Sequence, residues 1–95
     1  MESYGRMVHL ARRKKEWTVK TLIERLGGDL SPTYITKIEV HGEIPTPLVT
    51  FKIAKALDID LMELVEAAKT SKRFFFNESL DRKWEEIILL KDKKV

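Results

Sequence analysis

Residues 31–39 read SPTYITKIE, and this stretch says more about the architecture than any other in the 95-residue sequence. Ser31 is a favoured helix N-cap, and Pro32 at the first helical position has no amide hydrogen that would need a partner. Ile35 and Ile38 follow at helical spacing and form a narrow apolar stripe. The stretch therefore predicts a short helix with one buried side and one polar side. The polar side carries Thr33, Thr36 and Lys37.

Four more helices are expected in the first 68 residues, because similar start and stop signals recur there. Thr18, Thr46 and Asp60 are good N-caps, and the glycine pair at residues 27–28 ends the second helix. No strand-like alternation of any length occurs. The expected class is therefore all-α. The expected helices lie near residues 3–15, 19–26, 32–39, 47–57 and 61–68.

The character of the sequence changes at Lys69, and a sixth helix with its own apolar stripe is expected near the C-terminus. Each large apolar side chain left in water forgoes about 1.5–3 kcal/mol of burial free energy, so this stripe needs a cover. We expect a second copy of the chain to provide it about a two-fold axis. Packing back onto the first five helices and binding a different protein are the alternatives. The stripe consists of Leu80, Trp84, Ile87 and Ile88.

The expected division of the chain is thus a helical domain at residues 1–68, then a linker and C-terminal helix at residues 69–95. The C-terminal part is interpreted as a dimerisation or partner-binding element.

Composition excludes several function classes. The chain has no cysteine, which rules out disulfides, thiolate catalysis and cysteine zinc sites, and its two histidines are too few to indicate a metal cluster. No nucleophile–base pair or carboxylate pair is positioned by spacing, so no enzyme and no cofactor are expected. The N-terminus has no apolar signal segment, and the longest aliphatic run, residues 87–90, is far too short to cross a membrane. A cytoplasmic protein without a membrane partner is expected.

Charge is unevenly distributed along the chain. Residues 1–28 carry seven basic and three acidic side chains, whereas residues 29–68 carry three basic and seven acidic ones. Residues 69–95 carry eight basic and five acidic side chains. The basic charge is therefore concentrated toward both ends of the chain.

The order of these pieces resembles the xenobiotic-response-element (XRE) family of helix-turn-helix regulators, which includes the phage Cro and lambda repressor domains. The resemblance covers about residues 5–68 and implies a five-helix lambda-repressor-like DNA-binding domain, here with an additional C-terminal helix. Four stretches carry it: Val8, Ala11, Arg12 and Lys15; Trp17-Thr18 with Leu22 and Leu26-Gly27; SPTYITKIE at 31–39; and Pro45 followed by FKIAKALDIDLMELV at 51–65.

The resemblance also implies roles for single residues in binding double-stranded DNA. A helix in the major groove needs side chains near its N-terminus that reach base edges, and an apolar back that packs on its own domain. The matching base-facing positions are Pro32, Thr33, Thr36 and Lys37. The positions expected to meet the sugar-phosphate backbone are Thr18, Lys20, Thr21, Tyr34 and Arg12, of which Arg12 could instead hold an acidic partner inside the domain. Glu39 matches a position that is usually structural.

Three departures from the family pattern stand out. Three residues, Gly28 to Leu30, separate the glycine and serine of the turn where the family usually has one, and Ile23 replaces a usual alanine. We interpret these as linked, because a bulkier Ile23 pushes the second and third helices apart and the longer turn spans the gap. Val19 replaces a common DNA-positioning glutamine. Glu43 stands where a basic residue is frequent.

The leading functional hypothesis is a homodimeric, sequence-specific transcriptional regulator that binds a palindromic operator and acts as a repressor. Two copies about 34 Å apart read a palindrome and add their affinities. One alternative is the antitoxin of a toxin–antitoxin pair that autoregulates its promoter and caps the toxin with residues 74–95. Another is a protein-interaction module that has kept the fold and lost DNA binding.

Overall fold

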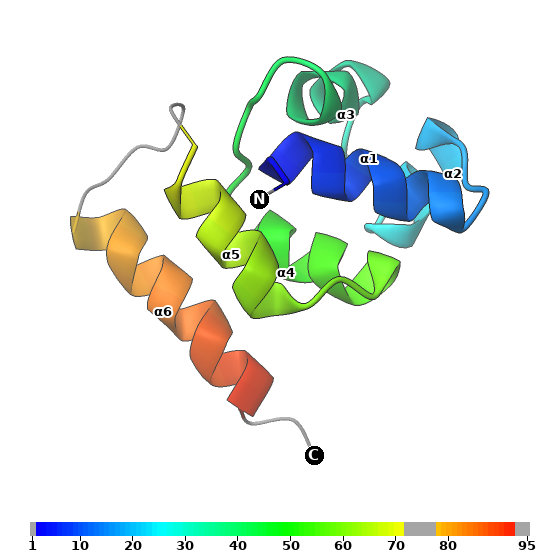
Figure 1. Cartoon of the computed structure of the whole chain (residues 1–95). Helices are drawn as coiled ribbons and strands as arrows, with labels where there is room; N and C mark the ends of the chain where they lie inside the picture. The colour runs from blue at the N-terminus through cyan, green and yellow to red at the C-terminus, as the bar shows by residue number, and fades with distance from the viewer. Residues whose placement is uncertain (1, 72–77, 93–95) are drawn as a thin grey trace.

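The structure is a computed structural model, which describes the backbone of residues 2–71 and 78–92 and the side chains of residues 2–71 and 82–90. Within these ranges the chain is helical and contains no strand, which confirms the expected all-α class (Figure 1). The helices are α1 (Tyr4–Lys14), α2 (Val19–Arg25), α3 (Pro32–Glu39), α4 (Pro47–Leu57), α5 (Leu61–Lys69) and α6 (Glu78–Asp92).

Side-chain caps explain where the first five helices begin. At each start, a hydroxyl or carboxylate oxygen accepts a hydrogen bond from the backbone amide three residues later, which satisfies one of the four free amides of the first turn. Thr46 and Pro47 provide such a start for α4, as Ser31 and Pro32 do for α3. The five capping residues are Ser3, Thr18, Ser31, Thr46 and Asp60.

Left-handed residues explain two of the tight turns. Gly27 and Gly28 follow α2 with φ of 109° and 83°, values that a residue with a side chain adopts only with strain. Asp58 ends α4 with φ of 56°, and aspartate tolerates this conformation better than most side chains. Lys15 Nζ lies 2.7 Å from Asp58 Oδ2 and so joins the end of α1 to this turn.

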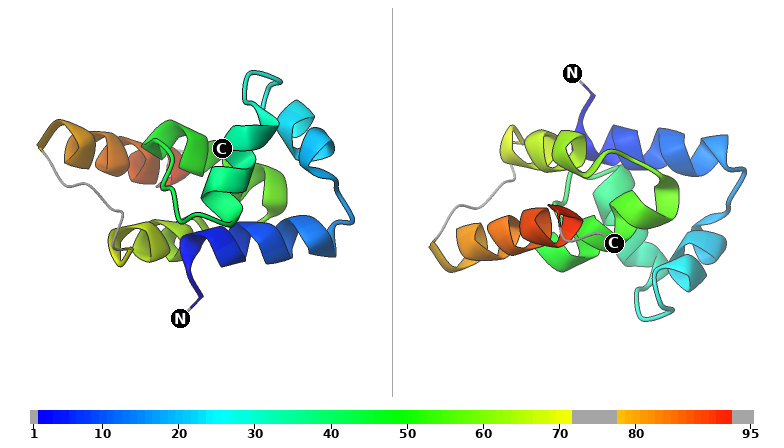
Figure 2. Two further views of the ribbon diagram at one scale, coloured as in Figure 1. Left: turned by 90° about the horizontal axis from the view of Figure 1, so that it is seen from above. Right: turned by 90° about the horizontal axis from the view of Figure 1, so that it is seen from below.

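Helix α1 is the central strut of the arrangement. It contacts α3, α4 and α5, while α2 packs against α3 at one end of the molecule (Figures 1 and 2). At the other end α6 lies against α4 and α5. The core side chains that are almost completely buried include Val8, Leu22, Ile35, Ile38, Ile53, Leu64 and Val65.

The position of α6 differs from the expected self-pairing. Trp84 and Ile87 retain only 1% and 3% of their exposure and belong to the same hydrophobic cluster as the core of the first five helices. Both therefore face their own chain rather than a second copy, because α4 and α5 leave an apolar surface that α6 covers. Ile88 is half-buried, and the side chain of Leu80 lies outside the described residues.

The N-terminus of α1 is held by two close contacts. The Tyr4 hydroxyl lies 2.7 Å from Thr50 Oγ1, and both side chains are buried, so each satisfies the other's polar atom. Burial raises the pKa of Tyr4, which keeps the hydroxyl protonated. Gly5 lies directly against the end of α3: a Cβ atom there would collide with the Ile38 carbonyl oxygen and lie 3.0 Å from that of Glu39. Only glycine allows this approach of α1 to α3.

Gly5→Ala should therefore destabilise the protein, although alanine is the better helix former by about 1 kcal/mol. The added methyl group meets backbone, which cannot move aside as a flexible side chain can, and overpacking typically costs about 1–3 kcal/mol. Urea unfolding followed by circular dichroism measures the effect. Lys14→Ala, at an exposed site on the same helix, is the control and should change stability by less than about 0.5 kcal/mol. Equal stability of both variants would contradict the close crossing of α1 and α3.

Candidate nucleic-acid interface

Helix α3 presents the expected polar side to solvent. Ile35 and Ile38 are buried, whereas the four residues predicted to face bases, Pro32, Thr33, Thr36 and Lys37, are all exposed. A residue four positions along a helix lies on the same face one turn later. The exposed side therefore consists of two neighbouring strips. One strip is Pro32 and Thr36, and the other is Thr33 and Lys37.

Tyr34 lies at the edge of this face. It is half-buried and packs against the core, with part of its surface open. Burial raises the pKa of Tyr34, and the nearby negative charge of Glu43 raises it further. The phenol is therefore neutral at physiological pH and retains a hydrogen that it can donate, as a phosphate contact requires.

The start of α2 carries the other predicted phosphate contacts. Thr18 is exposed, and its Oγ1 accepts a hydrogen bond from the Thr21 amide at 3.1 Å. The two threonine hydroxyls also lie 3.1 Å apart, and Lys20 is exposed beside them. Val19, in contrast, is half-buried and packs against the core. Val19, which replaces the glutamine common in the family, thus contributes to the packing of the domain's core.

Arg12 has a different role from the predicted phosphate contact. Its Nε and Nη2 donate to the two carboxylate oxygens of Glu39 at 2.8 and 3.0 Å, and its Nη1 donates to the Trp17 carbonyl oxygen at 2.8 Å. The Arg12 side chain is only 10% exposed and that of Glu39 only 5%. The guanidinium thus has its hydrogen-bond partners inside the domain and not on phosphate, which corrects the prediction. Arg12 joins α1 to the C-terminal end of α3.

Glu39 also forms a hydrogen bond with His9, whose Nδ1 lies 2.9 Å from Glu39 Oε1. Burial alone would raise the pKa of the Glu39 carboxyl, but the hydrogen bonds and charges of Arg12 and His9 outweigh it and lower that pKa below its ordinary value of 4.5. Glu39 is therefore ionised in the folded protein. The carboxylate holds two α1 side chains and fixes the orientation of α3 relative to α1.

Sequence reasoning did not foresee the surroundings of Trp17. The Lys15 ammonium and the Arg25 guanidinium lie 5.3 and 5.0 Å from the centre of its ring, in the range of cation–π attraction. A shallow depression beside it is lined by Arg13, Trp17 and Thr18, among others. Arg13 and Arg25 are exposed and place further positive charge around the start of α2. The basic run at residues 12–15 was the signal in the sequence.

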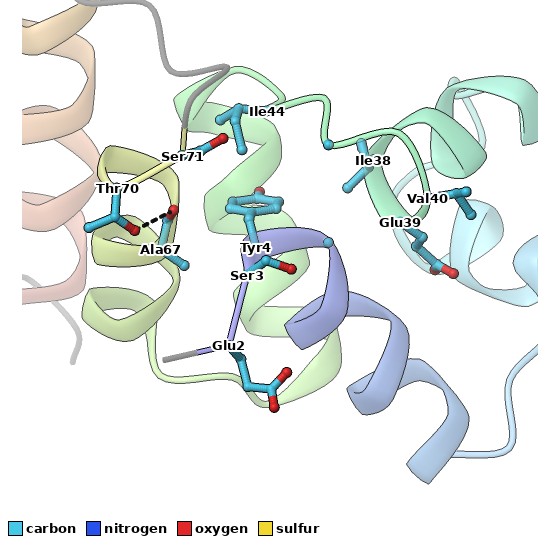
Figure 3. Close-up of a pocket in the computed structure, with 12 residues that line it drawn as sticks. Glu2, Ser3, Tyr4, Ile38, Glu39, Val40, Ile44, Ala67, Thr70 and Ser71 are labelled. Atoms are coloured by element: carbon cyan, nitrogen blue, oxygen red, sulfur yellow. Dashed lines mark hydrogen bonds between the residues drawn. The ribbon is translucent and has the colours of Figure 1, made fainter.

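A pocket of about 610 Å³ lies at the C-terminal end of α3, between the start of α1, the loop after α3 and the end of α5 (Figure 3). Apolar side chains from these elements line much of it, among them Tyr4, Ile38 and Ile44. Among the described residues that line it, Glu2 and Glu39 are the carboxylates, and Glu39 is hydrogen-bonded to Arg12.

The described part of the chain offers no candidate metal site and no candidate membrane span. No group of three or more histidine, cysteine, aspartate or glutamate residues there could hold a metal ion. None of the helices described has the length and apolar character to cross a bilayer.

Comparison with known proteins identifies the fold family. A family model described as helix-turn-helix matches residues 8–64, which is more than half of the chain. The chain belongs to the helix-turn-helix family. It is of the XRE type, with the lambda-repressor-like all-α fold, and at the level of the family it is a DNA-binding transcription regulator. No curated protein and no solved structure matches it.

The Glu39 carboxylate should be a pH-dependent source of stability. Its pKa is lower in the folded state, so its contribution is present above the ordinary value of 4.5 and is lost as the pH falls through the lowered value. Glu39→Gln leaves the buried Arg12 charge without its counterion, and it should cost about 3–5 kcal/mol at pH 7. The difference in unfolding free energy between wild type and variant should shrink below about pH 4.5.

Urea unfolding at a series of pH values measures this difference. Glu24→Gln, an exposed carboxylate on α2, serves as the control and should stay within about 0.5 kcal/mol of wild type throughout. A gap between Glu39→Gln and wild type that does not change with pH would contradict the assignment.

Proposed function

We propose that this helix-turn-helix protein binds a palindromic operator as a homodimer and acts as a repressor. The observation that carries the proposal is the presentation of α3. Its polar side, with Thr33, Thr36 and Lys37, is exposed along its whole length, while its other side is buried and its far end is clamped by Arg12 and Glu39. A rigid helix with one free polar side suits the DNA major groove.

The proposed contacts follow from the chemistry of the groove. Lys37 offers hydrogen-bond donors, and guanine presents two acceptors, O6 and N7, on its major-groove edge. Thr33 lies one turn before Lys37 on the same strip. Thr18, Lys20, Thr21 and Tyr34 would contact phosphate oxygens and set the register of the helix without reading sequence.

Repression is proposed because it requires only occupancy of a promoter site.

A single helix reads few base pairs, and each good contact is worth roughly 1–3 kcal/mol. Pairing two copies therefore raises affinity and doubles the sequence that is read. The exposed leucines of α6, Leu89 at 57% and Leu90 at 48%, offer an apolar surface for this pairing. Trp84 and Ile87 hold the helix so that Leu89 faces outward.

DNA binding should fall steeply as salt rises, because each lysine–phosphate contact releases condensed counterions. Selection of bound duplexes from a random pool gives the operator, and titrations at several salt concentrations give the slope. Lys20→Ala should weaken binding to all duplexes and reduce the slope by about one. Lys37→Ala should weaken operator binding by about 1–3 kcal/mol and relax the base preference at one position.

Lys69→Ala, on α5 and exposed, is the matched control and should leave both the affinity and the slope unchanged. Failure to retain any duplex even in dilute buffer would refute the proposed function. Unchanged operator affinity in Lys37→Ala would remove Lys37 from the reading face.

The α6 surface makes a separate prediction about the oligomeric state. Leu89→Glu places a charge on an exposed helical position, so it should keep the helical circular dichroism of the wild type while converting dimers to monomers. Sedimentation equilibrium measures the mass. Glu85→Gln, also exposed on α6, is the control. A dimer that persists in Leu89→Glu would place the interface elsewhere, and a monomeric wild type bound to DNA would contradict the homodimer.

A further inference from the structure

Thr36 is exposed on the polar side of α3, but its hydroxyl group is already used within the helix. Its Oγ1 donates a hydrogen bond to the Pro32 carbonyl oxygen, one turn earlier, at 3.1 Å. A threonine hydroxyl has a single hydrogen to donate. The side chain therefore offers a DNA base its methyl group and oxygen lone pairs, but no donor.

The stereochemistry of threonine separates these two groups. The hydroxyl and the methyl occupy different staggered positions on the tetrahedral Cβ, and a hydroxyl bonded to the carbonyl of residue i−4 is a recognised helical arrangement of threonine. With the hydroxyl turned onto the helix backbone, the methyl is the group left for an outside partner. The hydrogen bond to the Pro32 carbonyl thus leaves a nominally polar residue to act as an apolar contact.

Pro32 extends this contact along the helix. It is exposed, its ring is apolar, and it lies four residues before Thr36 on the same face. The two residues form an apolar strip on an otherwise polar side, next to the strip of Thr33 and Lys37. No described residue forms an ion pair with Lys37, so the adjacent strip retains its donors.

We propose that Pro32 and Thr36 read the 5-methyl group of a thymine in the operator, an inference that rests on the proposed function. Thymine is the DNA base whose major-groove edge carries a methyl group, and apolar contact with a threonine methyl is a known way of recognising it. A donor-bearing residue here would favour purine acceptors instead. The strip therefore selects a base by shape and apolar surface, beside a lysine that selects by hydrogen bonding.

The test replaces each thymine of the selected operator by uracil, which removes the methyl and keeps every hydrogen-bonding group. At one thymine position, uracil in a single half-site should weaken wild-type binding about fourfold, the loss expected for one buried methyl-sized group, and uracil in both half-sites about sixteenfold. Thr36→Ser removes the side-chain methyl from both copies and keeps the hydroxyl, so it should bind the thymine operator about sixteenfold more weakly. It should also respond less to uracil, because only Pro32 is left to contact the thymine methyl. Thr36→Val keeps a methyl without the hydroxyl and should retain both the affinity and the preference for thymine.

The two variants separate this inference from a hydrogen-bonding role for Thr36. If the hydroxyl reads the base, Thr36→Ser will bind like wild type and Thr36→Val will lose affinity, which would overturn the inference. A wild-type affinity that no uracil substitution changes would overturn it as well, while duplex binding itself would still support the proposed function. Absence of duplex binding would refute the proposed function and the inference with it. Circular dichroism melting of both variants checks that the exposed site tolerates the changes.

Discussion

The ion pair between Arg12 and Glu39 is the interaction on which the presentation of α3 depends. Both charges are almost completely buried, and the guanidinium meets the carboxylate through two hydrogen bonds. Desolvating two charges is expensive, and an apolar pair of similar volume is often equally stable. What the pair adds is direction, since a two-pronged contact holds one relative orientation of α1 and α3. We interpret it as the element that fixes how the DNA-facing side of α3 is aimed.

Two further contacts make α1 a rigid support for this geometry. Gly5 brings the backbone of α1 against that of α3, and the hydroxyl pair of Tyr4 and Thr50 fastens α1 to α4. Two of these contacts lie at the N-terminus of α1 and the ion pair lies near its C-terminal end, and they use different chemistry: a close backbone approach, a neutral hydrogen bond and an ion pair. The exposed side of α3 is then free to interact while its C-terminal end stays in place.

Local signals in the sequence were sufficient to predict the first five helices. The caps Thr18, Ser31, Thr46 and Asp60 act through hydrogen bonds to amides three residues away, so a short window of sequence contains all the partners. The exposed side of α3 follows from the same logic, because Ile35 and Ile38 fix which side is buried. The DNA contacts themselves remain predictions.

Long-range partners were harder to predict because the type of a side chain indicates the kind of partner that it needs but not which residue or molecule provides it. The stripe with Trp84 and Ile87 required a cover, and its own α4 and α5 provide one, although a second copy would satisfy the same energetics. Arg12 required an anion, and a carboxylate 27 positions away was as good a candidate as phosphate. The hydroxyl of Thr36 is a smaller case of the same difficulty, because a backbone carbonyl one turn earlier competes with a base for it.

The docking of α6 bears directly on how two copies would share one operator. If α6 were a loose tail, pairing through it would leave the distance between the two reading helices variable, and half-sites at many spacings would bind equally. Because Trp84 anchors α6 in the same core as α3, an interface on its outer leucines would place the second α3 at a fixed distance. Half-sites of helix-turn-helix dimers lie one helical turn or a multiple apart, which demands such rigidity. In the proposed dimer, the buried face of α6 would set the position of the helix, and its exposed face would use that position to set the spacing of the half-sites.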